Sequence, residues 1–208
     1  MLNFEIRKLG TTNNQQPSKS MHRHFIIHKP YFMLSQFKLE RQGVKRLLGE
    51  LHDFPEGTMS VGRLDEKSEG LLFLTTDGKL SAHINSKKVE KEYYAQVDGL
   101  MDDVTAEKLR DGVEISIEGK KYQTKDCKVE LLRKNPGFPE RIRRVRDDRH
   151  GPTSWVSITL REGKFRQVRK MTAVVGFATL RLIRVRIGQV RLGNMLAGEV
   201  IEVDAFDL

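Results

Sequence analysis

One carboxylate in this sequence stands where a protein scaffold would present a reactive group. Asp65 lies in the polar stretch 63–69, between an apolar entry that includes Val61 and the apolar run 71–74. This pattern predicts a loop between two buried strands, and such loops often carry catalytic side chains. Arg63 precedes Asp65 by two residues, and a carboxylate can act as a nucleophile or a general base. A polar surface loop without chemistry is the ordinary alternative.

Three histidines near the N-terminus raise the question of a metal site. His22, His24 and His28 have no cysteine or carboxylate at a helpful spacing, which disfavours zinc. Residues 24–30 are better explained as a strand that ends at a proline.

The single cysteine, Cys127, can form neither an internal disulfide nor a zinc site alone, which favours a reducing cytosol. The sequence also has no glycine-rich phosphate loop, so we expect neither a metal nor a cofactor.

The positive charge of the chain is concentrated in one segment. The net charge is +9, and from Arg161 to Arg191 nine basic residues and one acid, Glu162, give 9 − 1 = +8. A second basic cluster runs from Arg141 to Arg149. Arginine favours planar, bidentate contact with phosphate, so this asymmetry predicts a polyanionic partner, whereas a solvated basic face is the alternative. The candidate RNA-binding residues in these clusters are Arg143, Arg144, Arg166, Lys170, Arg181, Arg184 and Arg186.

Length and composition set the class of protein. The chain has 208 residues, of which 38% are hydrophobic and 31% charged, which suits one or two compact domains with a real core. No apolar stretch approaches the roughly 20 residues that cross a bilayer, and the N-terminus has no signal-peptide core. We therefore expect a cytoplasmic monomer without membrane contact. Residues 1–22 are polar and predict a flexible tail.

Apolar periodicity predicts several strands and three or four helices. In the stretch 91–97, alternation places Tyr93 on one face and Tyr94 on the other. In the helix 165–175, Phe165 and Val168 belong to the side spaced for burial, whereas Arg169 belongs to a basic side that calls for an anion. The other predicted helices are 44–52, 80–84 and 105–110, and the other strands include a hairpin from 113, 155–160, 180–187, 190–192 and 199–203.

The stretch 133–153 breaks every periodic pattern. It is rich in proline, glycine and arginine, and a loop of this length within a compact domain is usually functional or disordered. We interpret it as an RNA-contacting insertion that is only partly ordered in the free protein.

Three separated motifs carry a family resemblance. The segments GRLDEKSEGLLFLTTDG, KEYYAQVDG and GPTSWVSITLREGKFRQVRKMTAVVGFATLRLIRVRIG resemble, in order, bacterial ribosomal pseudouridine synthases of the RsuA group, most closely its E-type members for 23S rRNA. The resemblance covers about residues 24 to 203. It implies an α+β fold with a largely antiparallel mixed sheet and two subdomains around a catalytic cleft. Residues 23–208 would form the catalytic domain, without the S4-type RNA-binding domain of longer relatives.

The resemblance also assigns roles to residues. It implies that Asp65 is the catalytic nucleophile or base, that Tyr93 stacks on the target uracil, and that Arg169 is the basic partner of Asp65. A cation nearby would keep the carboxylate ionised and aim it. The resemblance further implies RNA contact for Lys29. We expect Arg63 to act as a wedge or to contact the backbone of the flipped nucleotide, and Leu74 and Ile187 to form apolar walls of the uracil pocket.

The expected function is the site-specific isomerisation of uridine to pseudouridine in 23S rRNA or a large-subunit assembly intermediate. The reaction exchanges an N-glycosidic bond for a C–C bond to the same ribose, and in principle it requires no cofactor. The target must leave its stack, at a cost of a few kcal/mol that phosphate and stacking contacts offset. Two alternatives are a synthase that acts on 16S or another RNA, and a non-catalytic rRNA-binding assembly factor. A DNA-binding protein is a weaker alternative, because no recognition-helix pattern is present.

Overall fold

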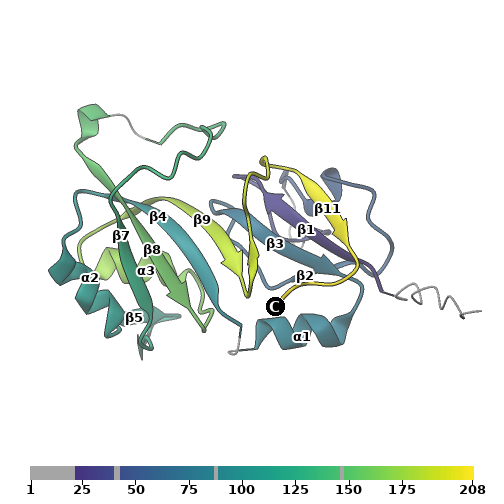
Figure 1. Cartoon of the computed structure of the whole chain (residues 1–208), viewed down its shortest axis with the longest axis horizontal. Helices are drawn as coiled ribbons and strands as arrows, with labels where there is room; N and C mark the ends of the chain where they lie inside the picture. Colours follow the sequence, from purple (N-terminus) through teal and green to yellow (C-terminus); the bar gives the residue numbers. More distant parts are fainter. Residues whose placement is uncertain (1–21, 40–42, 87–88, 146–147) are drawn as a thin grey trace, which may run out of the picture.

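The computed structural model describes residues 22–39, 43–86, 89–145 and 148–208. Their central feature is a mixed sheet in the order β11-β1-β3-β9-β4-β8-β7, with β2 added on β3 and β10 on β9 (Figure 1). Its pairings are antiparallel except between β3 and β9. The strands are β1 (His24–Lys29), β2 (Met59–Val61), β3 (Glu69–Thr75), β4 (Lys91–Asp98), β7 (Lys128–Leu132), β8 (Thr153–Leu160), β9 (Thr179–Ile187), β10 (Val190–Arg191) and β11 (Val200–Val203).

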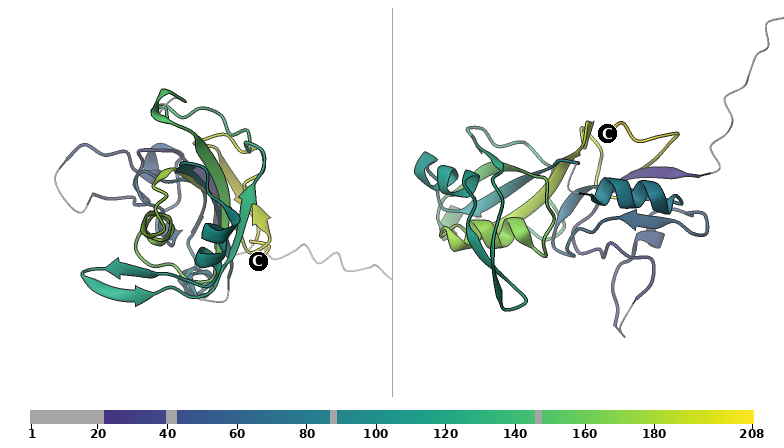
Figure 2. Two further views of the ribbon diagram at one scale, coloured as in Figure 1. Left: turned by 90° about the vertical axis from the view of Figure 1, so that its left-hand side faces the viewer. Right: turned by 90° about the horizontal axis from the view of Figure 1, so that it is seen from below.

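The helices and a separate hairpin flank this sheet. The hairpin of β5 (Glu114–Ile117) and β6 (Lys120–Gln123) extends away from it, as the teal arrows in the left view of Figure 2 show. The described helices are α1 (Gly78–Asn85), α2 (Asp103–Arg110) and α3 (Gln167–Val174), and two short 3-10 turns lie at Leu48–Glu50 and Asp148–His150. None of these helices has the length and apolar character that a membrane crossing requires.

The parallel pairing of β3 with β9 joins the two halves of the sheet. It comprises only the register pairs Glu69–Ile183 and Gly70–Arg184. Gly70 has φ +108°, and a Cβ on it would lie 2.3 Å from the Arg184 carbonyl oxygen. Because only glycine tolerates this conformation and this approach, Gly70 allows the two halves to meet. The loop before β3 is thereby brought close to the segment after β8.

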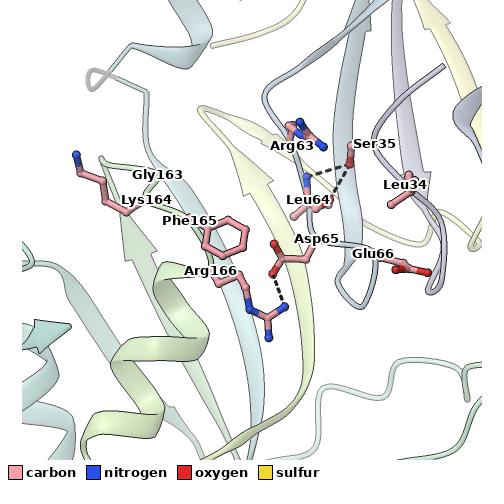
Figure 3. Close-up of a pocket in the computed structure, with 10 residues that line it drawn as sticks. All are labelled: Leu34, Ser35, Arg63, Leu64, Asp65, Glu66, Gly163, Lys164, Phe165 and Arg166. Atoms are coloured by element: carbon pink, nitrogen blue, oxygen red, sulfur yellow. Dashed lines mark hydrogen bonds and ion pairs between the residues drawn. The ribbon is translucent and has the colours of Figure 1, made fainter. Parts of the chain in front are cut away.

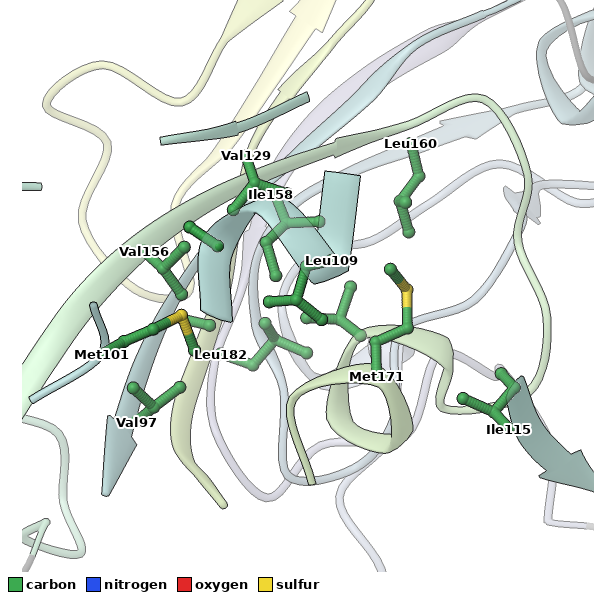
Figure 4. Packing of buried hydrophobic residues seen from close by; sticks show 13 residues of the cluster. Val97, Met101, Leu109, Ile115, Val129, Val156, Ile158, Leu160, Met171 and Leu182 are labelled. Carbon is green, nitrogen blue, oxygen red and sulfur yellow. The ribbon is translucent and has the colours of Figure 1, made fainter. Parts of the chain in front are cut away.

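Three hydrophobic clusters hold the elements in place. One packs α2 and α3 on the sheet, where Leu109, Met171 and Ile158 gather (Figure 4). The second lies under α1 and includes Phe73 and Ile84, while the third fills the space between β1, β3 and the segment 33–54. Burial of each such side chain contributes about 1.5–3 kcal/mol. These three clusters therefore hold both halves of the sheet in place.

Most of the predicted elements are confirmed. The sheet is largely antiparallel, the fold is α+β, and Tyr93 and Tyr94 pack in different clusters. The helix predicted over 105–110 is α2, and Asp102 caps its start by accepting a hydrogen bond from the Thr105 amide at 2.8 Å. The described residues of the stretch 133–153 are irregular apart from the 3-10 turn 148–150 and the start of β8 at Thr153.

Two predictions about helices were wrong. The helix predicted over 44–52 is reduced to a 3-10 turn, because Val44 is fully exposed while Leu48 alone of its stripe is fully buried. The spacing of apolar residues was present, but tertiary contacts did not use it. Helix α3 begins at Gln167, so Phe165 precedes it and is 64% exposed, whereas Met171 takes the buried place. The predicted tail lies outside the described residues except for His22.

Candidate active site

Asp65 lies in the loop between β2 and β3, and a set of backbone contacts fixes that loop. The Ser35 hydroxyl donates to the Leu64 carbonyl at 2.9 Å and accepts from the Leu64 amide at 3.0 Å. The Phe32 amide donates to the Glu66 carbonyl at 2.9 Å, and the Ser68 amide to the Asp65 carbonyl at 3.0 Å. The loop is therefore tied on both sides of Asp65, which holds its carboxylate in one place.

Two arginines approach the same oxygen of Asp65. The Nε atom of Arg169 lies 3.7 Å from Oδ2, and an Nη1 atom of Arg166 lies 3.8 Å from it. Among the described residues, none donates a hydrogen bond to this carboxylate. The two cations therefore lie beside the carboxylate and can orient it, while its lone pairs remain available to a substrate.

Arg169 is held more firmly than a surface arginine. Its guanidinium donates to the Lys67 carbonyl at 2.7 Å, to the Ser68 hydroxyl at 3.3 Å and to the Thr179 carbonyl at 3.1 Å. Burial lowers the pKa of Arg169, and the charge of Asp65 raises it in part, but an arginine stays charged at any physiological pH. Arg169 thus links the loop before β3 to the start of β9, one from each half of the sheet.

Arg166 reaches Asp65 through an unusual backbone conformation. It has φ +54° at the residue that precedes α3. A residue other than glycine in this region is uncommon, and such conformations cluster at functional sites. The conformation lets the chain leave β8, expose Phe165, and return a guanidinium to the carboxylate (Figure 3).

A cleft with a deeper recess surrounds these groups. The cleft has a volume of about 610 Å³, and the residues in Figure 3 line it from the loop at Asp65 on one side and the segment 163–166 on the other. A smaller recess of about 70 Å³ also contains Asp65 and is lined by Tyr93, Leu160 and Leu182. The carboxylate of Asp65 therefore lines both a broad cleft and a small recess beside it.

The comparisons with known proteins decide the family. A family model described as RNA pseudouridylate synthase matches residues 23–174, which includes the loop of Asp65 and the helix of Arg169. The chain belongs to the RNA pseudouridylate synthase family.

Similar proteins agree with this assignment. Ribosomal large subunit pseudouridine synthase E of Vibrio parahaemolyticus is 42% identical over 180 residues, covering 86% of this chain and 72% of that protein. The protein of the same name from Xanthomonas axonopodis pv. citri is 41% identical over 169 residues, covering 80% and 86%. A crystal structure of a pseudouridylate synthase superposes with a TM-score of 0.68 at 27% identity, covering 88% of this chain and 70% of that one.

The structure of this synthase brings most residues of the predicted centre together. Asp65, Arg63 and Tyr93 line the recess, and Arg169 contacts Asp65 directly. Arg166, predicted only as an RNA contact, adds a second cation. Sequence reasoning missed Ser35 and the exposed Phe165, both of which line the cleft. An aromatic residue between Lys164 and Arg166 is a pattern typical of base stacking, and it could have identified Phe165.

Several residues predicted to contact the substrate do not line the cleft or the recess. Leu74 and Ile187 lie in the hydrophobic clusters and line neither the cleft nor the recess. Lys29, predicted to contact RNA, is fully buried, and its ammonium group donates to the carbonyls of Pro30 at 2.9 Å and Met33 at 2.7 Å. Alternation along a strand predicts which side chains are buried, but it does not predict whether a buried side chain lines the cleft.

The arginines of β9 are also turned inward. Arg181 makes a bidentate pair with Glu69, at 3.0 and 2.8 Å, and Arg186 pairs with Glu92 at 2.8 Å. Arg184 is buried and donates to the Leu71 carbonyl at 2.7 Å. These three stabilise the sheet and are not surface contacts for phosphate. The predicted RNA-binding residues that stay exposed are Arg143, Arg144 and Arg166, while Lys170 is half-buried and donates to the Ser116 carbonyl.

Proposed function

We propose that this synthase isomerises a uridine of large-subunit (23S) rRNA and that Asp65 performs the chemistry. The observation that carries the proposal is the Asp65 carboxylate beside Arg166 and Arg169, at 3.8 and 3.7 Å, in a cleft wide enough to admit a nucleotide. The names of the similar proteins from Vibrio and Xanthomonas support the substrate class.

The reaction sets the demands on the site. The bond from uracil N1 to ribose C1′ breaks, the uracil turns, and a bond from C5 to C1′ forms. C5 then loses its proton and N1 gains one, so atoms and electrons balance without an external reactant. A carboxylate can attack C1′ or the uracil ring as a nucleophile, and it can remove the C5 proton as a base. Asp65 is the carboxylate of the recess whose oxygens are available for this, because Glu162 already accepts from Tyr122, Gln167 and Lys125.

The surroundings of Asp65 suit a flipped uridine. Tyr93 offers an aromatic face in the recess, where stacking on a base contributes about 1–3 kcal/mol. Phe165 is exposed at the mouth of the cleft, and Arg63 and Lys164 flank it. These groups would hold the phosphates and neighbouring bases of the extruded nucleotide.

Mapping of pseudouridine in rRNA tests the substrate. The 23S and 16S rRNA of cells that lack the protein should be compared with those of cells that carry it. We expect one 23S position to lose pseudouridine and to regain it when the wild-type gene is restored. Loss at a 16S position would redirect the proposal to another RNA. Unchanged pseudouridine in all rRNA would contradict it and favour a non-catalytic binding role.

A further inference from the structure

A second cavity lies next to the catalytic cleft. It has a volume of about 240 Å³ and is enclosed by the end of β1, the start of β9, the segment 138–142 and the segment 195–198. The segment 65–69 separates the two sites, because Asp65 lines the cleft and Glu69 lines this cavity. Arg141, which lines it too, is close enough to Arg169 to influence its pKa.

Two buried polar atoms of the lining have no hydrogen-bond partner. They are Nε2 of His28 and Nη1 of Arg141, and His28 is 6% exposed. Buried polar atoms are almost always paired, so each orphan calls for an explanation. Arg141 donates from Nε to the Arg143 carbonyl at 2.6 Å, and its guanidinium lies 4.1 Å above the Tyr31 ring. Its Nη1 atom lies 3.9 Å from Oε1 of Glu69, an ion pair too long for a hydrogen bond. Its position is therefore fixed although one of its donors is unused.

The tautomer of His28 follows from its one hydrogen bond. Its Nδ1 atom lies 2.8 Å from the Met195 carbonyl oxygen, which only accepts, so Nδ1 carries the hydrogen. Burial lowers the pKa of His28, which favours the neutral ring. In that state Nε2 is a bare acceptor. The cavity thus offers one unused acceptor and one unused donor.

The other groups of the cavity favour a flat, uncharged ligand. Each cation of the lining already faces a carboxylate, because Glu69 pairs with Arg181 at 3.0 and 2.8 Å and with Arg141 at 3.9 Å, and Arg46 pairs with Glu50 at 3.1 Å. Glu140 pairs with Arg144 at 3.2 Å. A phosphate group would find no free cation pair and would lie beside Glu69. The rings of Tyr31 and Phe138 supply apolar surface in the lining. RNA bases that leave their stack are recognised in this way, by aromatic or guanidinium planes and by hydrogen bonds at their edges.

We propose that this cavity binds a second base of the substrate RNA, near the target uridine in sequence or space, with His28 accepting from its N–H group and Arg141 donating to its carbonyl or ring nitrogen. The inference rests on the proposed function. Ile142 is 91% exposed at the rim and the neighbouring Arg143 is exposed as well, so the strand that carries this base has a basic contact outside the cavity. The enzyme would then read a nucleotide besides the one it converts.

A pair of matched variants isolates the unused acceptor. His28→Asn keeps a donor near the place of Nδ1 and deletes Nε2. His24→Asn is the matched control, because it makes the same change at the other buried histidine of β1. The Nδ1 atom of His24 is 2.8 Å from the Thr75 hydroxyl, and His24 lies outside the cavity. Phe138→Leu is a second test variant, because it keeps apolar volume and removes an aromatic face. Thermal unfolding of all three establishes that they fold.

The experiment combines these variants with abasic substitutions. A 23S rRNA fragment that contains the converted uridine is prepared with single abasic residues at each nearby position, and kcat/KM is measured for each. With the wild-type enzyme we expect one position to lose about tenfold or more, the scale of a buried hydrogen bond. That penalty should shrink to about threefold or less in His28→Asn or Phe138→Leu and persist in His24→Asn.

The outcomes separate the inference from the proposed function. If the intact fragment is converted but no abasic position is penalised, or if the penalty is the same in the His28 and Phe138 variants as in the wild type, the second base site is wrong and the function stands. If the wild-type enzyme converts no uridine in 23S rRNA, the proposed function fails first, and the inference fails with it.

Discussion

Two groups of arginines from the same C-terminal stretch occupy opposite environments. Arg166 and Arg169 surround a carboxylate that no described residue hydrogen-bonds, in a cleft open to a substrate. On β9, Arg181 and Arg186 are paired with glutamates that lie 112 and 94 residues earlier in the chain. Charge counted along the sequence therefore did not measure charge on the surface. The two groups differ in whether a glutamate from another strand pairs with the arginine.

The comparison predicts that substitutions in the two groups change the free energy of unfolding by different amounts. Arg181→Met leaves Glu69 charged and buried, and breaking a buried pair from one side costs about 3–5 kcal/mol of unfolding free energy. Arg166→Met removes a side chain that is 41% exposed and should change that free energy by less than about 1 kcal/mol. Urea unfolding of both variants checks this. Equal losses would remove the distinction between the two groups.

Loss of Arg169 should affect the rate more than binding. Arg169→Met removes the buried cation 3.7 Å from Asp65 and three hydrogen bonds that fix the loop. Removal of one preorganised electrostatic group lowers kcat on the order of 100-fold. Single-turnover pseudouridine formation at saturating rRNA measures the rate, with Arg186→Met as the control. A rate close to wild type would show that Asp65 does not need this cation.

The buried ammonium group of Lys29 extends the comparison to the half of the sheet that contains β1. Burial lowers the pKa of Lys29 from 10.5 to about 7, so between about pH 7 and 10.5 the unfolded chain binds more protons than the folded one. The unfolding free energy should therefore rise with pH in this window, with a Lys29 contribution of up to about 1.4 kcal/mol per pH unit. Urea titrations of wild type and Lys29→Met should differ in slope there. Parallel curves would contradict the lowered pKa.

The smallest effect concerns exposed cations. Lys164→Gln should reduce the slope of log Kd against log salt for rRNA binding by roughly one unit, because one phosphate contact releases about one counterion. Arg186→Gln should leave the slope unchanged, since that side chain is paired with Glu90 and Glu92. Filter binding across a salt series measures both. An unchanged slope for Lys164→Gln would remove it from the RNA interface.

Local patterns predicted the parts of the fold that local physics decides. Alternation separated Tyr93 from Tyr94, and the apolar runs located the strands that carry the loop of Asp65. The helix predicted over 44–52 did not form because Val44 is exposed and only Leu48 and Leu51 of its apolar residues join a hydrophobic cluster. The pairing of Asp65 with Arg169 spans more than a hundred residues, so only the family resemblance suggested it. The inward turn of Arg181 depends on Glu69 in another strand, and no local pattern contains that information.

The most direct test of the account is the Asp65→Asn variant. Pseudouridine formation in a 23S rRNA fragment is followed under single-turnover conditions, and the Kd for the same fragment is measured in parallel. Asp77→Asn is the control, because Asp77 caps α1 outside the cleft and asparagine caps helices equally well. We predict that Asp65→Asn binds the RNA within about threefold of wild type and forms no pseudouridine, while Asp77→Asn stays active. Conversion by Asp65→Asn at the wild-type rate would contradict the assignment of the chemistry to this carboxylate.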